Sequence, residues 1–177
     1  MKYRFCICLS LILLFNCNQT VKNDRSLTLI EKNDTQEKIE LNIVDFNSFE
    51  PYLKRQDNQV YIINFWATWC APCVKELPAF EKINSEFSNK NIKVILVSLD
   101  FPKQYESKLI PFIKENKLQS EIIVLNDTDS NTWIPKVSEE WSGAIPSTLI
   151  YSNTERKFYE KSFNYNELKI EVQQFLK

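Results

Sequence analysis

Two cysteines three residues apart carry the clearest chemistry in this sequence. Cys70 and Cys73 follow an apolar run, and Pro72 suits the first turn of a helix because it needs no amide donor there. Cysteines at positions i and i+3 of a first helical turn can bring their sulfurs within bonding distance, near unpaired backbone amides and the positive end of the helix dipole. A thiolate at that place is stabilised, so the spacing predicts a dithiol that exchanges with disulfides.

The two cysteines have different expected roles. Cys70 lies at the start of the predicted helix, is expected to be the more exposed, and is the predicted nucleophile. Cys73 lies one turn inward and is the predicted resolving thiol, which attacks the mixed disulfide at Cys70 and releases the reduced substrate. A plain stabilising disulfide is the alternative, but closing so small a loop adds little stability in the chain-entropy account.

The composition excludes several other kinds of chemistry. The 177 residues contain no histidine, which removes Ser–His and Cys–His catalysis and histidine metal sites. A single glycine removes glycine-rich phosphate loops. The net charge of -1 argues against nucleic acid as a partner. The remaining cysteines lie near the N-terminus and are Cys6, Cys8 and Cys17. They complete neither a disulfide framework nor a zinc ribbon.

The N-terminus is typical of an export signal. Its apolar run over residues 5–15 is too short for a membrane span, which needs about 20 residues, but suits a signal peptide. The run ends near Cys17 in a pattern that resembles a bacterial lipoprotein signal, with Asn16 in place of the usual small residue. We therefore predict a signal peptide over residues 1–16 and acylation of Cys17. An ordinary signal, cleaved or uncleaved, and a cytosolic N-terminus are the alternatives.

A polar stretch over residues 17–38 is predicted to be a solvated tether, and residues 39–177 alternate strand and helix patterns. Strands are expected at 39–44, 60–66, 92–99, 121–125, 147–151 and 156–163, and helices at 45–55, 72–88, 104–116, 129–141 and from 164 or 166 onward. Pro78 is expected to kink its helix, and Pro111 to bend or interrupt its own. This order predicts an α/β sandwich with parallel and antiparallel strand pairs.

Two segments resemble a known family. Residues 64–73 (NFWATWCAPC) resemble the active-site segment of thioredoxin-like proteins, and residues 143–148 (GAIPST) resemble the X-Pro loop of that fold. Three further features resemble the extracytoplasmic branch of the family, which includes disulfide reductases of the TlpA and ResA type. They are the extra strand and helix between the two segments, the signal sequence, and the presence of Glu76 and Pro78. The resemblance covers residues 39–177 and implies a thioredoxin-like sandwich, with a central mixed sheet flanked by helices and a strand-helix insert.

The resemblance also assigns roles around the cysteines. It implies that Glu76 shuttles the proton of Cys73, because the aspartate that assists thioredoxins is replaced by Asn64. A cis bond is expected before Pro146, beside backbone groups that an extended substrate can use. The residues assigned to substrate binding are Trp69, Pro72, Ile145 and Pro146. A solvated helix glutamate and an ordinary turn proline are the alternatives.

The other large or charged side chains receive simpler interpretations. Trp69 is expected to shield the thiols, whereas Trp66 fits the core and the site equally well. Trp133 and Trp141 are expected to pack in the core, with a part in partner choice as the alternative. Asp100 is expected to be a solvated loop charge.

The resemblance implies an exported, membrane-anchored thiol–disulfide oxidoreductase that reduces protein disulfides. The dithiol is itself the redox group, so no bound cofactor or metal is expected. Electrons are expected from a membrane dithiol donor, because an exported domain cannot reach cytosolic reductants; a monomer suits access to the site. Reduction of apocytochrome c before haem attachment is one task found in this branch.

Two alternatives to a disulfide reductase stay open. A disulfide oxidase or isomerase is one, since the reduction potentials of such cysteine pairs span about -270 to -120 mV. A non-catalytic peptide-binding module is the other.

Overall fold

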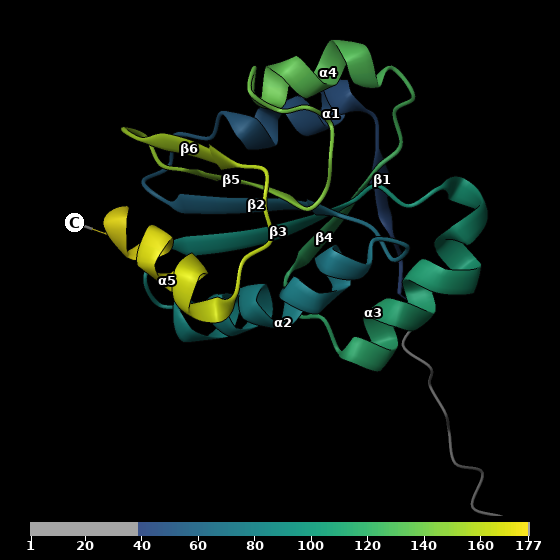
Figure 1. Cartoon of the computed structure of the whole chain (residues 1–177), viewed down its shortest axis with the longest axis horizontal. Helices are drawn as coiled ribbons and strands as arrows, with labels where there is room; N and C mark the ends of the chain where they lie inside the picture. The colour runs from purple at the N-terminus through teal and green to yellow at the C-terminus, as the bar shows by residue number, and fades with distance from the viewer. Residues whose placement is uncertain (1–38, 177) are drawn as a thin grey trace, which may run out of the picture. The chain divides into compact units, whose positions relative to one another are not determined.

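A six-stranded mixed sheet forms the centre of the structure, a computed structural model that describes residues 39–176 (Figure 1). The strands are β1 (Asn42–Val44), β2 (Val60–Trp66), β3 (Ile92–Ser98), β4 (Glu121–Leu125), β5 (Ser147–Tyr151) and β6 (Arg156–Tyr159). They lie in the order β1-β4-β3-β2-β5-β6, parallel from β1 to β2 and antiparallel from β2 to β6. The predicted signal peptide, Cys17 and the whole predicted tether lie outside the described residues.

Helices cover both faces of this sheet. They are α1 (Phe46–Phe49) with a 3-10 turn at Glu50–Leu53, α2 (Ala71–Glu86), α3 (Ile110–Asn116) after a π turn at Tyr105–Leu109, α4 (Ser130–Val137) and α5 (Tyr165–Gln174). Helices α2 and α5 lie on one face, and α1 and α4 lie on the other (Figure 1). Within residues 39–176, no helix has the length and apolar character needed to cross a membrane.

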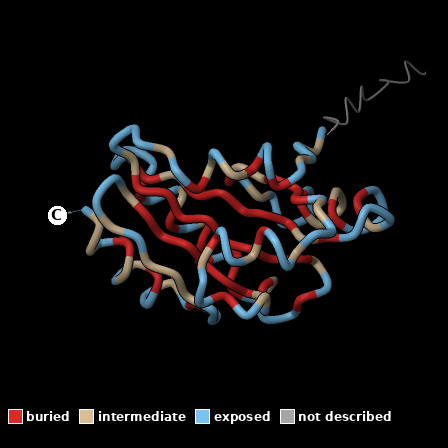
Figure 2. The backbone as a smooth tube through the Cα atoms, turned by 90° about the horizontal axis from the view of Figure 1, so that it is seen from above, coloured by how far each residue is buried: buried red, intermediate tan, exposed pale blue. Residues whose placement is uncertain are grey.

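The central strand β2 contributes to the hydrophobic cores on both faces. All seven of its residues are buried, as its nearly continuous apolar sequence predicts. Successive side chains point to opposite faces, so Ile62 and Trp66 pack toward α2 while Ile63 and Phe65 pack toward α1 and α4. Figure 2 shows that the buried stretches of the backbone run through the middle of the molecule, with exposed stretches around them. The end of β2, where the chain enters α2, is therefore held from both sides.

The observed sheet confirms the predicted α/β sandwich and its insert. Strands β2, β4 and β5 have the predicted bounds, and β4 lies between β1 and β3 as the extra strand. Strand β1 covers only Asn42–Val44, the residues that pair with β4. Strand β6 ends at Tyr159 rather than at residue 163, because the chain beyond it turns toward α2, where the Phe163 amide donates to Glu76 Oε2 at 2.7 Å.

Two predicted helices differ from those observed. Helix α4 ends at Val137 rather than at residue 141, because Ser138 takes an extended backbone with φ -158° and ψ 134°. The single helix expected over residues 104–116 is divided into the π turn and α3. Pro111 is the second residue of α3 and follows the π turn directly, so the change from π to α geometry falls where the proline lacks an amide hydrogen. The interruption expected at this proline therefore falls just before it.

Candidate active site

Cys70 and Cys73 lie at the start of α2 and form a disulfide. Cys70 caps the helix: its Sγ accepts a hydrogen bond from the backbone N–H of Cys73 at 3.3 Å. Cys70 is 6% exposed and Cys73 is 0% exposed, which is the order expected for a nucleophile and a resolving thiol. The sulfur of Cys70 thus lies against the amides and the positive dipole end of a helix of 16 residues.

The X-Pro loop lies against this disulfide. Strand β5 pairs antiparallel with β2, so the residues that precede β5 meet those that follow β2. The carbonyl oxygen of Ile145 is 3.7 Å from Cys70 Sγ, and the bond between Ile145 and Pro146 is cis, as predicted. The structure thus brings the two family-like segments together, although 75 positions separate Cys70 from Ile145.

Trp141 and Gly143 hold the X-Pro loop in place. The Trp141 indole N–H donates to the carbonyl of Ala144 at 2.8 Å, and its ring packs on Phe65 with centroids 4.6 Å apart. Trp141 is buried, which confirms its expected place in the core. Gly143, the one glycine of the chain, has φ 93°, and a Cβ there would lie 3.1 Å from Ile134 Cδ1. The backbone conformation therefore favours glycine, and any side chain there would also require Ile134 to shift slightly.

Replacing Gly143 with alanine is expected to lower the free energy of unfolding by about 1–2 kcal/mol, because a side chain is strained at this φ and Ile134 must move. Equilibrium unfolding in urea measures the change. The matched control is Glu140→Ala, an exposed position in the same loop, which should stay within about 0.5 kcal/mol of the original protein. An equally small change for Gly143→Ala would contradict the strain argument.

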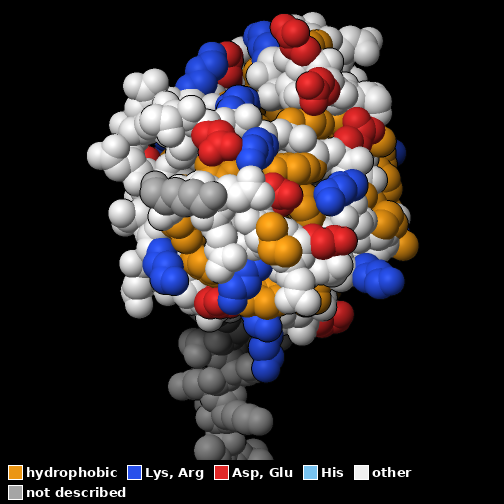
Figure 3. Space-filling model, turned by 60° about the vertical axis from the view of Figure 1, so that its left-hand side comes forward, with side chains coloured by type: hydrophobic (Ala, Val, Ile, Leu, Met, Phe, Trp, Pro, Cys, Tyr) orange, Lys and Arg blue, Asp and Glu red, His pale blue; other side chains and the backbone are white. Residues whose placement is uncertain are grey.

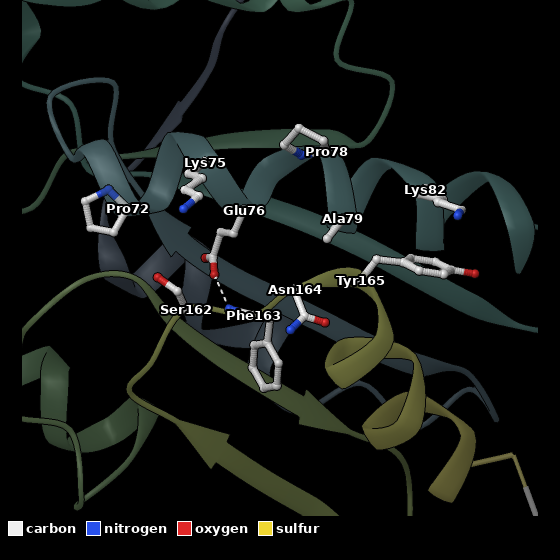
Figure 4. Close-up of a pocket in the computed structure, with 10 residues that line it drawn as sticks. All are labelled: Pro72, Lys75, Glu76, Pro78, Ala79, Lys82, Ser162, Phe163, Asn164 and Tyr165. Carbon is white, nitrogen blue, oxygen red and sulfur yellow. Dashed lines mark hydrogen bonds between the residues drawn. The ribbon is translucent and has the colours of Figure 1, made fainter.

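Glu76 is buried on the inner side of α2, about one turn after Cys73, and is 3% exposed. Its Oε1 accepts a hydrogen bond from Asn64 Nδ2 at 2.8 Å, and its Oε2 accepts one from the backbone N–H of Phe163 (Figure 4). Burial raises the pKa of Glu76 to about 7, while these two hydrogen bonds oppose the rise. The carboxyl group can therefore gain or lose a proton near neutral pH. A solvated helix glutamate, the alternative interpretation, is wrong.

Asn64 belongs to the same buried cluster, although the sequence indicated only that it replaces an aspartate. Its Nδ2 also lies 3.1 Å from Thr148 Oγ1, while its Oδ1 has no hydrogen-bond partner among the described residues. A side-chain amide can present either its donor or its acceptor. Asn64 can therefore donate to an ionised Glu76 or, after turning, accept from a protonated one. The available signal was a polar residue in an otherwise apolar strand.

A pocket of about 580 Å³ opens beside Glu76, between α2 and the segment that leads into α5 (Figure 4). Its lining residues are Pro72, Lys75, Glu76, Pro78, Ala79, Lys82, Ser162, Phe163, Asn164 and Tyr165. The Glu76 carboxylate points across it toward the Phe163 amide. The pocket gives this buried group a route for proton exchange with solvent.

Asp100 is not the solvated charge that the sequence predicted. It is 3% exposed, and its carboxylate accepts hydrogen bonds from the Thr68 backbone N–H at 3.1 Å and from Ser98 Oγ at 2.9 Å. The Thr68 hydroxyl donates to the same carboxylate. These donors replace water around the buried charge. Asp100 therefore ties the loop that precedes Cys70 to the end of β3.

The remaining tryptophans divide between core and surface. Trp66 is fully buried and packs on Phe112 with ring centroids 5.4 Å apart, so it belongs to the core. Trp133 is also buried in the core, as expected. Trp69 is 48% exposed and stacks on Phe101, with centroids 5.9 Å apart and rings inclined by 16°. Shielding of the thiols by Trp69 stays a prediction, and Phe101 is an exposed aromatic neighbour that the sequence analysis missed.

Charges of both signs are mixed on the face shown in Figure 3. Basic and acidic side chains alternate there, with apolar side chains between them. This mixture agrees with the net charge of -1. This face therefore lacks the continuous basic surface that nucleic acid binding requires.

The fold and the site together define a thioredoxin-like protein, with a cysteine pair at the start of the helix after the central strand and a cis-proline loop against it. The chain belongs to the AhpC/TSA family, whose profile matches residues 34–155, more than half of the sequence. The site residues Cys70, Cys73, Glu76 and Pro146 all lie within the matched range.

Known proteins similar to this chain include several thiol–disulfide oxidoreductases. The sporulation thiol-disulfide oxidoreductase A of Bacillus subtilis is 36% identical over 66 residues, which cover 37% of this chain and 40% of that protein. A peptide-N(4)-(N-acetyl-beta-glucosaminyl)asparagine amidase of Caenorhabditis briggsae is 26% identical over 118 residues, 66% of this chain and 20% of the amidase. The chain thus spans less than half the length of these two relatives.

A solved structure supports the fold assignment. The crystal structure of a secreted thiol-disulfide isomerase from Corynebacterium glutamicum matches with a TM-score of 0.57 and 19% sequence identity. The match covers 67% of this chain and 71% of that one. It confirms the thioredoxin-like fold that the sequence predicted.

Proposed function

We propose that this protein is a thiol–disulfide oxidoreductase that exchanges its Cys70–Cys73 pair with disulfides of other proteins. The observation that carries the proposal is the place of Cys70 Sγ: it caps α2, with Cys73 one turn inward and the Ile145 carbonyl 3.7 Å away. Several similar proteins are named thiol–disulfide oxidoreductases, which supports the same activity. A plain structural disulfide would need none of these surroundings.

In the reductive direction the exchange takes two steps. The Cys70 thiolate attacks one sulfur of a substrate disulfide, forms a mixed disulfide and expels the other substrate sulfur as a thiolate, which takes up a proton. Cys73 then gives up its proton and attacks Cys70 Sγ, which closes the protein disulfide and releases the second substrate thiolate. The substrate gains two electrons and the protein loses two.

Glu76 is the proposed proton acceptor for Cys73. The two residues are three positions apart on α2, so their side chains lie on neighbouring parts of one helix face. The ionised carboxylate can take the Cys73 proton, and the pocket beside it returns that proton to solvent. With its pKa raised to about 7 by burial, Glu76 is a stronger base than an ordinary carboxylate.

The proposed setting is extracytoplasmic. The apolar run over residues 5–15 supports export, and Cys17 just after it supports lipid attachment. One structurally similar protein is described as secreted. In that setting the electrons come from a membrane dithiol donor, the substrates are protein disulfides such as that of apocytochrome c, and the dithiol needs no bound cofactor. The reductive direction is part of this proposal.

An insulin-reduction assay tests the activity. We expect the protein to speed the precipitation of insulin chains by dithiothreitol, whereas a non-catalytic peptide-binding module would leave the dithiothreitol rate unchanged. Equilibration of the Cys70–Cys73 pair against glutathione then tests the direction. A potential below about -220 mV supports a reductant, and one near -120 mV supports an oxidase.

Replacing Cys73 with serine is expected to accumulate mixed disulfides between Cys70 and substrate proteins, because no thiol remains to resolve them. Non-reducing electrophoresis after incubation with an oxidised substrate shows the adducts. Cys70→Ser is the matched control and should trap almost none, because Cys73 has no exposed surface. Adducts in Cys70→Ser and none in Cys73→Ser would mean that the two roles are reversed.

A further inference from the structure

We propose that Asp100 is a positioning residue whose buried negative charge makes the Cys70–Cys73 pair a stronger reductant. It holds the loop before Cys70, and its charge opposes the formation of a thiolate on Cys70. The proposal rests on the proposed function and names a residue that sets the direction of exchange. The disulfide carries no charge, so Asp100 acts mainly on the reduced side of the equilibrium.

Asp100 is a buried charge without a counter-ion. It follows β3 closely and is 3% exposed, and Glu76 and Asp100 are the two buried carboxylates of the described chain. None of the ion pairs among residues 39–176 includes Asp100. An unpaired charge is costly to bury, and such groups concentrate at functional sites. The position of Asp100 beside the cysteine loop therefore indicates a part in the chemistry of that loop.

The contacts of Asp100 are those of an ionised carboxylate. The Thr68 backbone N–H donates to it at 3.1 Å, and the Thr68 hydroxyl donates to it as well. Ser98 Oγ accepts from the Asp100 backbone N–H at 3.1 Å, which leaves the Ser98 hydroxyl hydrogen free to bind the carboxylate. A carboxylate surrounded by donors acts only as an acceptor, which is the behaviour of the anion.

This charge lies close to Cys70. The Cys70 backbone N–H donates to the Ala67 carbonyl at 3.1 Å, so residues 67–70 form a tight turn that contains Thr68. Thr68 and Cys70 are two positions apart, at most about 7 Å along the chain, which places the carboxylate within roughly 10 Å of Cys70. Two unit charges about 10 Å apart, at an effective dielectric constant of about 20, change an equilibrium about tenfold.

The sign of the effect follows from the charge balance of reduction. The disulfide gains two electrons; when Cys73 takes up a proton and Cys70 stays a thiolate, the site gains one negative charge. Asp100 repels that charge and destabilises the reduced form, which lowers the reduction potential of the pair. The start of α2 has the opposite effect, because its amides and dipole stabilise the thiolate. Asp100 therefore offsets part of this stabilisation and favours the reductive direction.

Replacing Asp100 with asparagine tests the proposal in the full protein. Asparagine has nearly the same shape, and its oxygen can still accept from Thr68 while its amide donates to Ser98. Equilibration against glutathione should show the cysteine pair shifted about tenfold toward the reduced form, which is a potential about 30 mV higher. Iodoacetamide should also alkylate reduced Cys70 several-fold faster at pH 6 than in the original protein.

Two matched variants separate the charge from the hydrogen bonds. Ser98→Ala removes one donor but keeps the charge, so its potential should not rise, even though the loop is held less firmly. Glu106→Gln removes an exposed charge in the π turn, where water screens it, and should leave the potential unchanged.

These variants also define the contrary results. An unchanged potential in Asp100→Asn would overturn the proposal and leave the exchange activity standing. A rise in Ser98→Ala as large as that in Asp100→Asn would overturn it as well, because the effect would then come from the loop alone; Ser98→Ala keeps the proposal testable if Asp100→Asn does not fold. Failure of the original protein to reduce insulin would instead overturn the proposed function.

Discussion

Replacing Cys70 with serine is expected to abolish catalysed exchange, a loss of about 10³-fold or more in the rate of insulin reduction. A serine hydroxyl stays protonated near neutral pH and does not form a mixed disulfide. Cys73 cannot take over, because it is 0% exposed and lies one turn inside α2. The loss should therefore equal that of a variant without either cysteine.

The Cys73→Ser variant is the control that isolates this effect. It keeps the attacking thiol, so the first step should proceed at close to the original rate and stop at the mixed disulfide. Stopped-flow fluorescence can follow that step, because Trp69 is adjacent to Cys70 in the chain. If Cys70→Ser retained a tenth or more of the insulin-reducing activity, Cys70 would not be the nucleophile.

Replacing Glu76 with glutamine is expected to remove a large pH dependence from the stability of the oxidised protein. Burial raises the pKa of Glu76 from 4.5 to about 7, so folding favours the protonated form. The contribution of Glu76 to the free energy of unfolding should therefore be fully present below pH 4.5, fall as the pH rises toward 7, and then level off. A shift of that size corresponds to at most about 3 kcal/mol.

Glutamine fits the same site without this dependence. Its oxygen can accept from the Phe163 amide, and its amide can donate to Asn64 once the Asn64 side chain has turned. Urea unfolding at a series of pH values from 4 to 8 measures the difference. Glu115→Gln, an exposed position on α3, is the matched control and should follow the original curve. Parallel curves for Glu76→Gln and the original protein would show that Glu76 is not buried as a titrating group.

The same variant also tests the proposed proton transfer. If Glu76 accepts the Cys73 proton, the reduced Glu76→Gln protein should show a changed pKa for Cys73 and slower resolution of mixed disulfides above neutral pH. The chemical shift of the Cys73 Cβ carbon, followed by NMR against pH, measures the first quantity without requiring access to the buried sulfur. An unchanged thiol pKa would remove Glu76 from the mechanism even if the stability result holds.

Local sequence was sufficient to predict the elements that carry the cysteines. The apolar run Val60–Trp66 predicts a strand buried on both faces, and the observed strand has those bounds. Pro72 in a first turn predicts the start of α2 next to Cys70. These features depend on neighbours in the chain, which is why they could be read directly. The X-Pro loop depended on the resemblance to thioredoxin-like proteins, and the structure confirms its cis bond.

The features that were missed depend on contacts between distant parts of the chain. Asp100 is buried only because Thr68, 32 positions earlier, meets it across the end of the sheet. Strand β6 ends early because the Phe163 amide reaches Glu76, 87 positions away. No local pattern of charge or apolar spacing contains such pairs. Asn64 was the partial exception, since a polar residue inside a buried strand indicates that a partner must exist.

Alkylation of the reduced protein by iodoacetamide tests the central claim most directly, which is that the start of α2 stabilises a thiolate at Cys70. Tandem mass spectrometry of the peptide that contains both Cys70 and Cys73 shows which of the two sulfurs is alkylated. The account predicts an apparent pKa below the ordinary value of about 8.5 and, at pH 7, alkylation several-fold faster than in an unstructured peptide. A rate at Cys70 equal to that of the peptide would contradict it.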